Sequence, residues 1–127
     1  MRLNEVAQHA WDARVGLDPA AELDHGSAVA LAEHFTGGLG FLLGFVAKPA
    51  EAPSTVRLDA GDVALVIDDG RASLVTSVED PTATFRGSIE EVVRLVGGRL
   101  RPGLTPAGTD VTGNVSLDDL RRVFPGY

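Results

Sequence analysis

The residues best suited to chemistry lie near the start of the chain, where a glutamate, a histidine and an aspartate follow one another at helical spacing. Glu5 and His9 are four residues apart, and Asp12 follows three residues after His9. Side chains at positions i and i+4 share one face of a helix, with Cβ atoms about 5–6 Å apart. One carboxylate and one imidazole placed in this way can bind a single divalent metal, and Asp12 can fix the tautomer of the imidazole. The alternative is a solvated helix face on which the glutamate and the histidine meet by chance.

Two helices are predicted in the first 50 residues. Over 2–15, apolar side chains recur at three- and four-residue spacing and predict one buried stripe, made of Leu3, Val6, Ala10 and Ala13. Gly16 ends this helix, and a short helical turn is predicted at 19–23. A longer helix is predicted over 26–47, and its second half holds Gly37, Gly38, Gly40 and Gly44. Because glycines cost helix stability and permit close backbone approach, we expect this half to pack against another surface. His25 and His34 are expected at the surface or at helix ends.

Beyond a Pro-containing linker, the apolar period changes from 3.6 to 2, which predicts strands. The strands are expected at 55–59, 62–68, 71–78, 82–86 and 109–113, with a hairpin turn at Asp69-Gly70. A capping signal at Ser88 predicts a helix over about 89–97, and the residues expected on its buried face are Ile89, Val92, Val93 and Val96. A second capping signal at Ser116 predicts a last helix, with Leu117, Leu120 and Val123 facing inward. The pattern indicates an α+β fold, with a helical segment over 1–50 and a second domain over 51–127. In that domain, helices cover one face of an antiparallel or mixed sheet of about five strands.

Composition excludes several classes of function. The net charge of −7 argues against a nucleic-acid partner, and the lack of cysteine excludes thiolate ligands and disulfides. The longest apolar stretch, 35–47, is about 13 residues, whereas a membrane span needs roughly 20. No signal peptide, phosphate-binding glycine loop or local Ser/His/Asp pattern is recognised. We therefore expect a cytoplasmic protein that binds a small molecule, without nucleic acid and without membrane insertion.

The last third of the chain resembles sterol-carrier-protein-type domains. The matching features are an Asp-x-Thr strand at Asp80-Pro-Thr, a helix that ends in Leu95-Val-Gly-Gly-Arg-Leu-Arg-Pro102, and a Val-x-Gly strand at Val111-Thr-Gly. A final helix follows in both. The resemblance implies a concave core of sheet and helices that can hold an apolar ligand. The alternative is a core filled by its own side chains.

The first helix is similar to the last helix of DinB-like four-helix bundles, in the version found in mycothiol-dependent maleylpyruvate isomerases and their actinobacterial relatives. The stretch Glu5-Val-Ala-Gln-His9-Ala-Trp-Asp12 carries this resemblance. It implies that Glu5 and His9 are zinc ligands, and that mycothiol is the thiol cofactor whose thiolate the metal activates. It also implies an arginine of the C-terminal domain that binds a substrate carboxylate, with Arg99 as the first candidate and Arg101 as the second. The alternative for Arg99 is a surface charge near a helix C-terminus.

The family's bundle has three further helices, and one of them carries another histidine ligand. We therefore expect the C-terminal part of such an isomerase or thiol-transferase, a short relative, or a homodimer or other partner that supplies the missing ligands. Whether the chain is itself an enzyme stays open. A stand-alone carrier for a lipid or small apolar ligand is the second hypothesis, supported by Phe35, Phe41 and Phe45 with Leu39, Leu42 and Leu43. A dimerising accessory domain without catalysis is the third.

Overall fold

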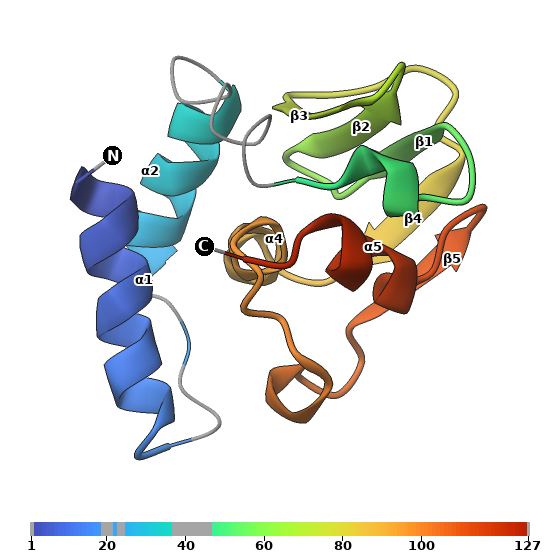
Figure 1. The fold of residues 1–127 in the computed structure, drawn as a ribbon. Coiled ribbons are helices and arrows are strands. Elements are labelled where there is room, and N and C mark those ends of the chain that lie inside the picture. The colour runs from blue at the N-terminus through green and yellow to red at the C-terminus, as the bar shows by residue number, and fades with distance from the viewer. Residues whose placement is uncertain (1, 19–21, 23–24, 37–46, 127) are drawn as a thin grey trace.

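Two N-terminal helices precede a five-stranded mixed sheet with further helices, as the α+β prediction required (Figure 1). The structure, a computed structural model, describes residues 2–18, 22, 25–36 and 47–126, with the backbone alone for 2–8 and 34. The helices are α1 (Arg2–Val15), α2 (His25–Thr36), α4 (Ile89–Val96) and α5 (Leu117–Val123), with 3-10 turns η1 (Pro49–Glu51) and η2 (Pro102–Leu104). The strands are β1 (Val56–Asp59), β2 (Ala64–Asp68), β3 (Arg71–Val75), β4 (Ala83–Arg86) and β5 (Asp110–Gly113).

The strands lie in the order β3-β2-β1-β4-β5. In chain order, the first three strands form an antiparallel meander. The predicted hairpin turn is confirmed between β2 and β3, where Asp69 and Gly70 have φ values of 49° and 71°. The fourth strand does not pair with the third, as successive antiparallel pairing would require, but lies parallel to β1 on its other side. Thr82 holds it there. Its N–H donates to the Arg57 carbonyl at 2.8 Å, and its hydroxyl accepts from the Arg57 N–H at 2.9 Å.

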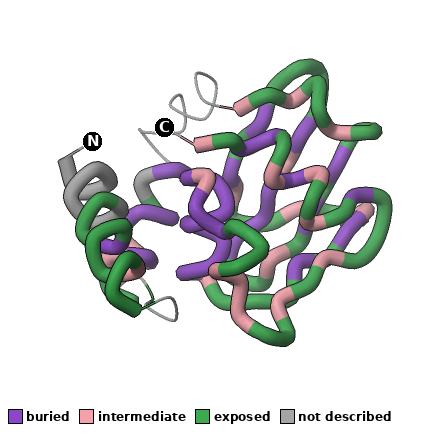
Figure 2. The backbone as a smooth tube through the Cα atoms, turned by 60° about the horizontal axis from the view of Figure 1, so that its bottom comes forward, coloured by how far each residue is buried: buried purple, intermediate pink, exposed green. Residues whose placement is uncertain are grey.

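One face of the sheet is buried and the other is exposed, which confirms that the helices cover a single face (Figure 2). Strand residues alternate between the two faces. The buried positions of this face are Val56, Leu58, Leu65, Ile67, Ala72, Leu74, Ala83 and Phe85. Ala64, at the start of β2, is buried as well and departs from the alternation. Leu58 pairs with Leu65 across β1 and β2, and Leu65 pairs with Leu74 across β2 and β3, so the buried side chains form continuous rows.

Helix α4 occupies the middle of the molecule (Figure 1) and packs against α2. Its predicted inward residues Val92, Val93 and Val96 are buried, and Ile89 is half-buried. Its charged side chains are also buried, which the amphipathic pattern did not predict. The helix begins as predicted at Ser88, whose hydroxyl accepts from the Glu91 N–H at 3.2 Å. A complete capping box forms at α5, where the Ser116 hydroxyl accepts from the Asp119 N–H and the Asp119 carboxylate accepts from the Ser116 N–H.

The first two helices contribute to the same hydrophobic core as the sheet. Trp11 of α1 joins it, together with four residues of α2, which are Ala28, Leu31, Ala32 and Phe35. The predicted stripe on α1 is wrong at Ala10 and Ala13, which are exposed, because the helix turns its bulky Trp11 inward instead. The side chains of Leu3 and Val6 lie outside the described residues. The division into segments 1–50 and 51–127 stays a prediction.

The second half of the predicted long helix lies outside the described residues. Helix α2 is described as far as Thr36, and the description resumes at Ala47. The four glycines and the aromatic residues Phe41 and Phe45 therefore fall in the undescribed part, as does almost all of the predicted turn at 19–23. His25 is exposed at the start of α2, and the His34 side chain is not described. None of the described helices is long and apolar enough to span a membrane.

Candidate functional site

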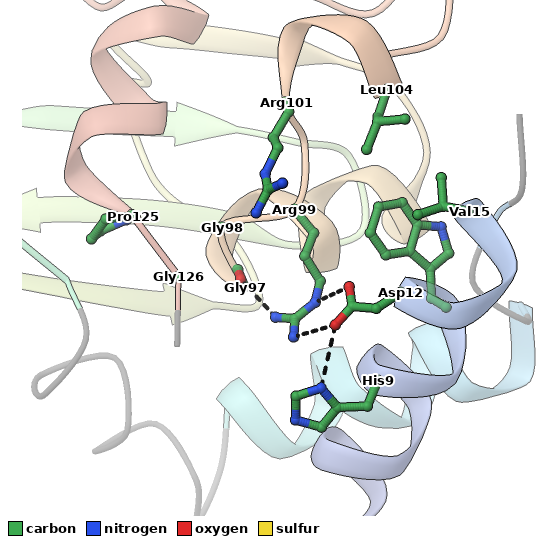
Figure 3. Close-up of a pocket in the computed structure, with 11 residues that line it drawn as sticks. His9, Asp12, Val15, Gly97, Gly98, Arg99, Arg101, Leu104, Pro125 and Gly126 are labelled. Atoms are coloured by element: carbon green, nitrogen blue, oxygen red, sulfur yellow. Dashed lines mark hydrogen bonds and ion pairs between the residues drawn. The ribbon is translucent and has the colours of Figure 1, made fainter. Parts of the chain in front are cut away.

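A cavity of about 320 Å³ lies between α1, the end of α4 and the last residues of the chain (Figure 3). It brings together four of the five residues that the sequence singled out, from segments almost ninety positions apart. Its lining consists of His9, Trp11, Asp12, Val15, Gly97, Gly98, Arg99, Arg101, Leu104, Pro125 and Gly126. The fifth predicted residue, Glu5, lies on α1, and its side chain is outside the described part of the structure.

Arg99 and Asp12 form a two-point ion pair across the cavity wall. Arg99 Nε donates to Asp12 Oδ1 at 2.9 Å, and Nη2 donates to Oδ2 at 3.0 Å. Arg99 Nη1 donates to the carbonyl of Gly97 at 2.9 Å. The Arg99 side chain is only 6% exposed, whereas the Asp12 carboxylate is 41% exposed. Such parallel hydrogen bonds fix the geometry of both groups as well as their charge.

The glycines at the end of α4 direct Arg99 toward α1. Gly98 has a φ of 71°, which ends the helix, and the Arg99 N–H then donates to the Arg94 carbonyl at 2.7 Å. The chain also approaches Gly98 closely, since a Cβ there would lie 2.2 Å from the Cα of Gly126. The C-terminal segment can therefore form one wall of the cavity only because residue 98 has no side chain.

His9 extends the ion pair into a chain of three residues. Its Nδ1 lies 3.3 Å from Asp12 Oδ2, and its side chain is 64% exposed. Burial raises the pKa of Asp12, but the hydrogen bonds and charges of Arg99 and His9 outweigh this effect, so the pKa is lowered from its ordinary value of 3.8. An ionised Asp12 that accepts from Nδ1–H leaves the lone pair on Nε2, the atom that a metal would require.

A second arginine contacts α1 at Trp11, next to Asp12. The guanidinium carbon of Arg94 lies 5.1 Å from the centroid of the Trp11 ring, within cation–π range. Arg94 is 1% exposed; its Nη1 donates to the Leu104 carbonyl at 2.9 Å and its Nη2 to Glu90 Oε2 at 3.1 Å. Its Nε lies 2.5 Å from Glu90 Oε1 as an ion pair, without hydrogen-bond alignment. Sequence reasoning missed this pair, although the i,i+4 spacing of Glu90 and Arg94 was a usable signal.

Arg101 lines the same cavity but differs from Arg99 in its surroundings. It is exposed, and its guanidinium has no hydrogen-bond or ion-pair partner among the described residues. Its carbonyl accepts from the Leu104 N–H and the Thr105 hydroxyl, which holds the backbone of this loop in place. In Figure 3 its side chain points from that loop toward Gly98 and Arg99.

The described residues fit one part of a metal site but not a whole one. His9 with Asp12 behind it is the usual pairing of an imidazole ligand with an orienting carboxylate. Across the described residues, however, no group of three His, Cys, Asp or Glu side chains is placed to hold a metal ion. Asp12 is already engaged by Arg99. Any zinc site therefore needs ligands beyond the described side chains, and Glu5 as one of them stays a prediction.

Comparison with known proteins gives no match from which a function can be inferred. No protein-family model matches the sequence, and no curated protein matches it significantly. The function must therefore be argued from the cavity and its residues.

Proposed function

We propose that the chain supplies one side of a composite, metal-dependent active site of the mycothiol-dependent maleylpyruvate isomerase type. The observation that carries the proposal is the meeting of His9, Asp12 and Arg99 in one cavity, although Arg99 is 87 residues away from Asp12. The sequence predicted His9 as a metal ligand and Asp12 as the residue that orients it, and the family resemblance implied Arg99 as an arginine of the C-terminal domain at the same site. Surface residues chosen for unrelated reasons would not be expected to converge in this way.

In the proposed site, each residue of the chain has a distinct role. His9 offers Nε2 to the metal together with Glu5, Asp12 orients the imidazole, and Arg99 holds Asp12. The remaining ligands come from a second copy of the chain or from another helical segment. When bound, the metal supplies Lewis acidity that lowers the pKa of a thiol such as mycothiol, so that the thiolate forms near neutral pH.

The carrier and dimerisation hypotheses have less support from the described residues. A carrier needs space at the inner face of the sheet, but the large side chains there, including Leu58, Leu65 and Phe85, pack into one cluster and are each at most 4% exposed. The glycine-rich segment on which the dimerisation hypothesis depended lies outside the described residues. Co-purified lipid would favour the carrier, and a metal-free dimer would favour the assembly domain.

Metal titration with mass measurement on the same sample tests the proposal. Zn²⁺ or Co²⁺ is titrated into the wild type, His9→Ala, Glu5→Gln and the control His25→Ala, which removes an exposed histidine on α2. We expect a stoichiometric site whose metal affinity falls at least tenfold in the first two variants and stays unchanged in the control. Loss of a residue that only orients a ligand already lowers metal affinity by about 10–100-fold, so loss of a ligand should lower it at least as much. A rise in mass on metal addition would indicate ligands pooled between chains. Equal affinities for His9→Ala and His25→Ala, or no metal bound at any concentration, would refute it.

A further inference from the structure

The last described residues of the chain form a wall of the cavity without hydrogen bonds to it. Phe124 anchors this segment, because its side chain is 1% exposed and its N–H donates to the Leu120 carbonyl at 3.0 Å. Pro125 is exposed and has no N–H group, and Gly126 is half-buried and has no side chain. Neither of these two residues makes a hydrogen bond to another described residue. The segment 125–126 is therefore held in the wall by van der Waals contact alone.

Two glycines with positive φ values make this contact. Gly98 ends α4 with a φ of 71°, and Gly126 has a φ of 102°. A Cβ at residue 98 would lie 2.2 Å from the Cα of Gly126, and a Cβ at residue 126 would lie 3.3 Å from the Gly97 carbonyl oxygen. That carbonyl accepts from Arg99 Nη1 at 2.9 Å. The segment therefore lies against the end of α4 at the point where Arg99 is held, as Figure 3 shows.

The segment lies on the more buried side of the ion pair between Arg99 and Asp12. The Asp12 side chain is 41% exposed, whereas the Arg99 side chain is 6% exposed. Pro125 lines both this cavity and an adjacent one of about 210 Å³, so it forms part of the partition between them. If the segment lifted, water would reach the Arg99 guanidinium from this side. Ion pairs that are exposed to water are weaker than buried ones, so Arg99 would hold Asp12 less tightly.

We propose that residues 125 and 126 are a strap that opens at the contact between Gly98 and Gly126, and that its closed position keeps Arg99 bonded to Asp12. The strap moves about the buried Phe124, so its opening breaks no hydrogen bond among the described residues. Segments with few buried contacts open locally at a small fraction of the free energy of global unfolding. This inference goes beyond the proposed function, because it concerns contacts within the chain and needs no metal.

Hydrogen exchange followed by NMR, on the full chain without metal, tests the strap. The reporters are the backbone N–H of Gly98, at the contact, and the Nε–H of Arg99, which donates to Asp12. The backbone amides of β2, which is paired on both sides, report global unfolding. In the wild type, we expect both reporters to exchange faster than the β2 amides. Their exchange should also depend little on added denaturant, because a local opening exposes little surface.

Two glycine variants separate strap opening from global unfolding. Gly126→Ala places alanine at a φ of 102°, a strain that an open strap relaxes, so the open state is favoured about five- to thirtyfold. The matched control, Gly61→Ala, places similar strain at a φ of 84° between β1 and β2, where a Cβ meets nothing within 4 Å. We expect exchange of both reporters to accelerate by that factor in Gly126→Ala. In Gly61→Ala only the β2 amides should accelerate.

Three results would overturn the inference. Reporters that exchange together with the β2 amides in the wild type, or that accelerate equally in both variants, would show that the segment is a fixed part of the fold. Acceleration at Gly98 without acceleration at Arg99 in Gly126→Ala would show that the strap does not control the ion pair. Because the samples contain no metal, failure of the strap and failure of the proposed zinc site are distinguishable.

Discussion

The ion pair between Asp12 and Arg99 permits the sharpest test of how α1 is attached to the rest of the protein. Changing Asp12 to Asn keeps the size of the side chain but removes the charge that Arg99 faces. Arg99 then stays 6% exposed and faces an amide in place of the carboxylate. Leaving a buried charge poorly compensated is destabilising, so the free energy of unfolding should fall.

The size of the effect follows from the exposure of the two partners. Breaking a fully buried pair costs about 3–5 kcal/mol, whereas exposed pairs contribute about 0.2–1 kcal/mol. Arg99 belongs to the first class, but the Asp12 carboxylate is 41% exposed and is screened by solvent. We therefore expect a loss of about 2 kcal/mol for Asp12→Asn, and a coupling of about 1–2 kcal/mol in a double-mutant cycle with Arg99→Gln.

The pH dependence of the free energy of unfolding supplies a second, independent test of the ion pair. The pKa of Asp12 in the folded protein is lowered below its ordinary value of 3.8, because Arg99 and His9 outweigh the burial that raises it. The unfolded chain therefore takes up this proton first as the pH falls. The stability from Asp12 is fully present above about pH 5 and is lost as the pH drops through the folded pKa, below 3.8.

The assay is chemical denaturation of the wild type, both single variants and the double variant at pH 7, repeated for wild type and Asp12→Asn at lower pH. Asp118→Asn is the matched control, because its partner Arg121 is nearby in sequence and the Asp118 side chain is 73% exposed. We expect that control to lose less than about 0.5 kcal/mol. Equal losses of stability in Asp12→Asn and Asp118→Asn would refute this role of the ion pair. A stability difference between the wild type and Asp12→Asn that grows below pH 4 would refute it as well.

Two further predictions concern the end and the centre of α4. Gly98→Ala and Gly70→Ala both place alanine at a φ of 71°, and this backbone strain costs about 1–2 kcal/mol in each variant. The two positions differ in their surroundings, because a Cβ at residue 70 meets nothing within 4 Å, whereas one at residue 98 collides with Gly126. Denaturation should therefore show a larger loss for Gly98→Ala, and equal losses would mean that the tail contact contributes nothing. Arg94→Met should cost about 3–5 kcal/mol because it removes the cation that faces the buried Glu90 carboxylate. Adding Glu90→Gln should recover part of that loss, and no recovery would show that the cation–π contact dominates instead.

Local patterns in the sequence were sufficient to predict the elements of the fold. Apolar residues at every second position located β1 and β2. Asp69-Gly70 predicted the turn between β2 and β3, because only a few residue types accept two successive positive φ values. The position of β4 beside β1 was not predictable in this way. Its parallel pairing depends on where the link after β3 carries the chain, and the contacts of Thr82 that hold it there join residues 25 positions apart.

The candidate site was predictable residue by residue but not as an arrangement. Spacing placed His9 and Asp12 on one helix face, whereas nothing local could pair Asp12 with a residue 87 positions later. The burial of Arg94 was also hidden, because an isolated amphipathic helix offers one apolar face and α4 is packed on more than one side. Once α4 is central, its charged residues have to be paired within the protein.

The polar character of these contacts has a consequence for His9. Hydrophobic attraction has no direction, so a helix held by apolar contacts alone can rotate or slide at little cost. Among the described side chains of α1, Trp11 is fully buried and Val15 is half-buried. The Arg99 fork meets both oxygens of Asp12 in a single orientation, and Arg94 meets Trp11 next to it. His9 lies nearly one turn before Asp12 on the same helix, and its Nδ1 contacts Asp12. A substitution at Arg99 is therefore expected to act on the imidazole through Asp12.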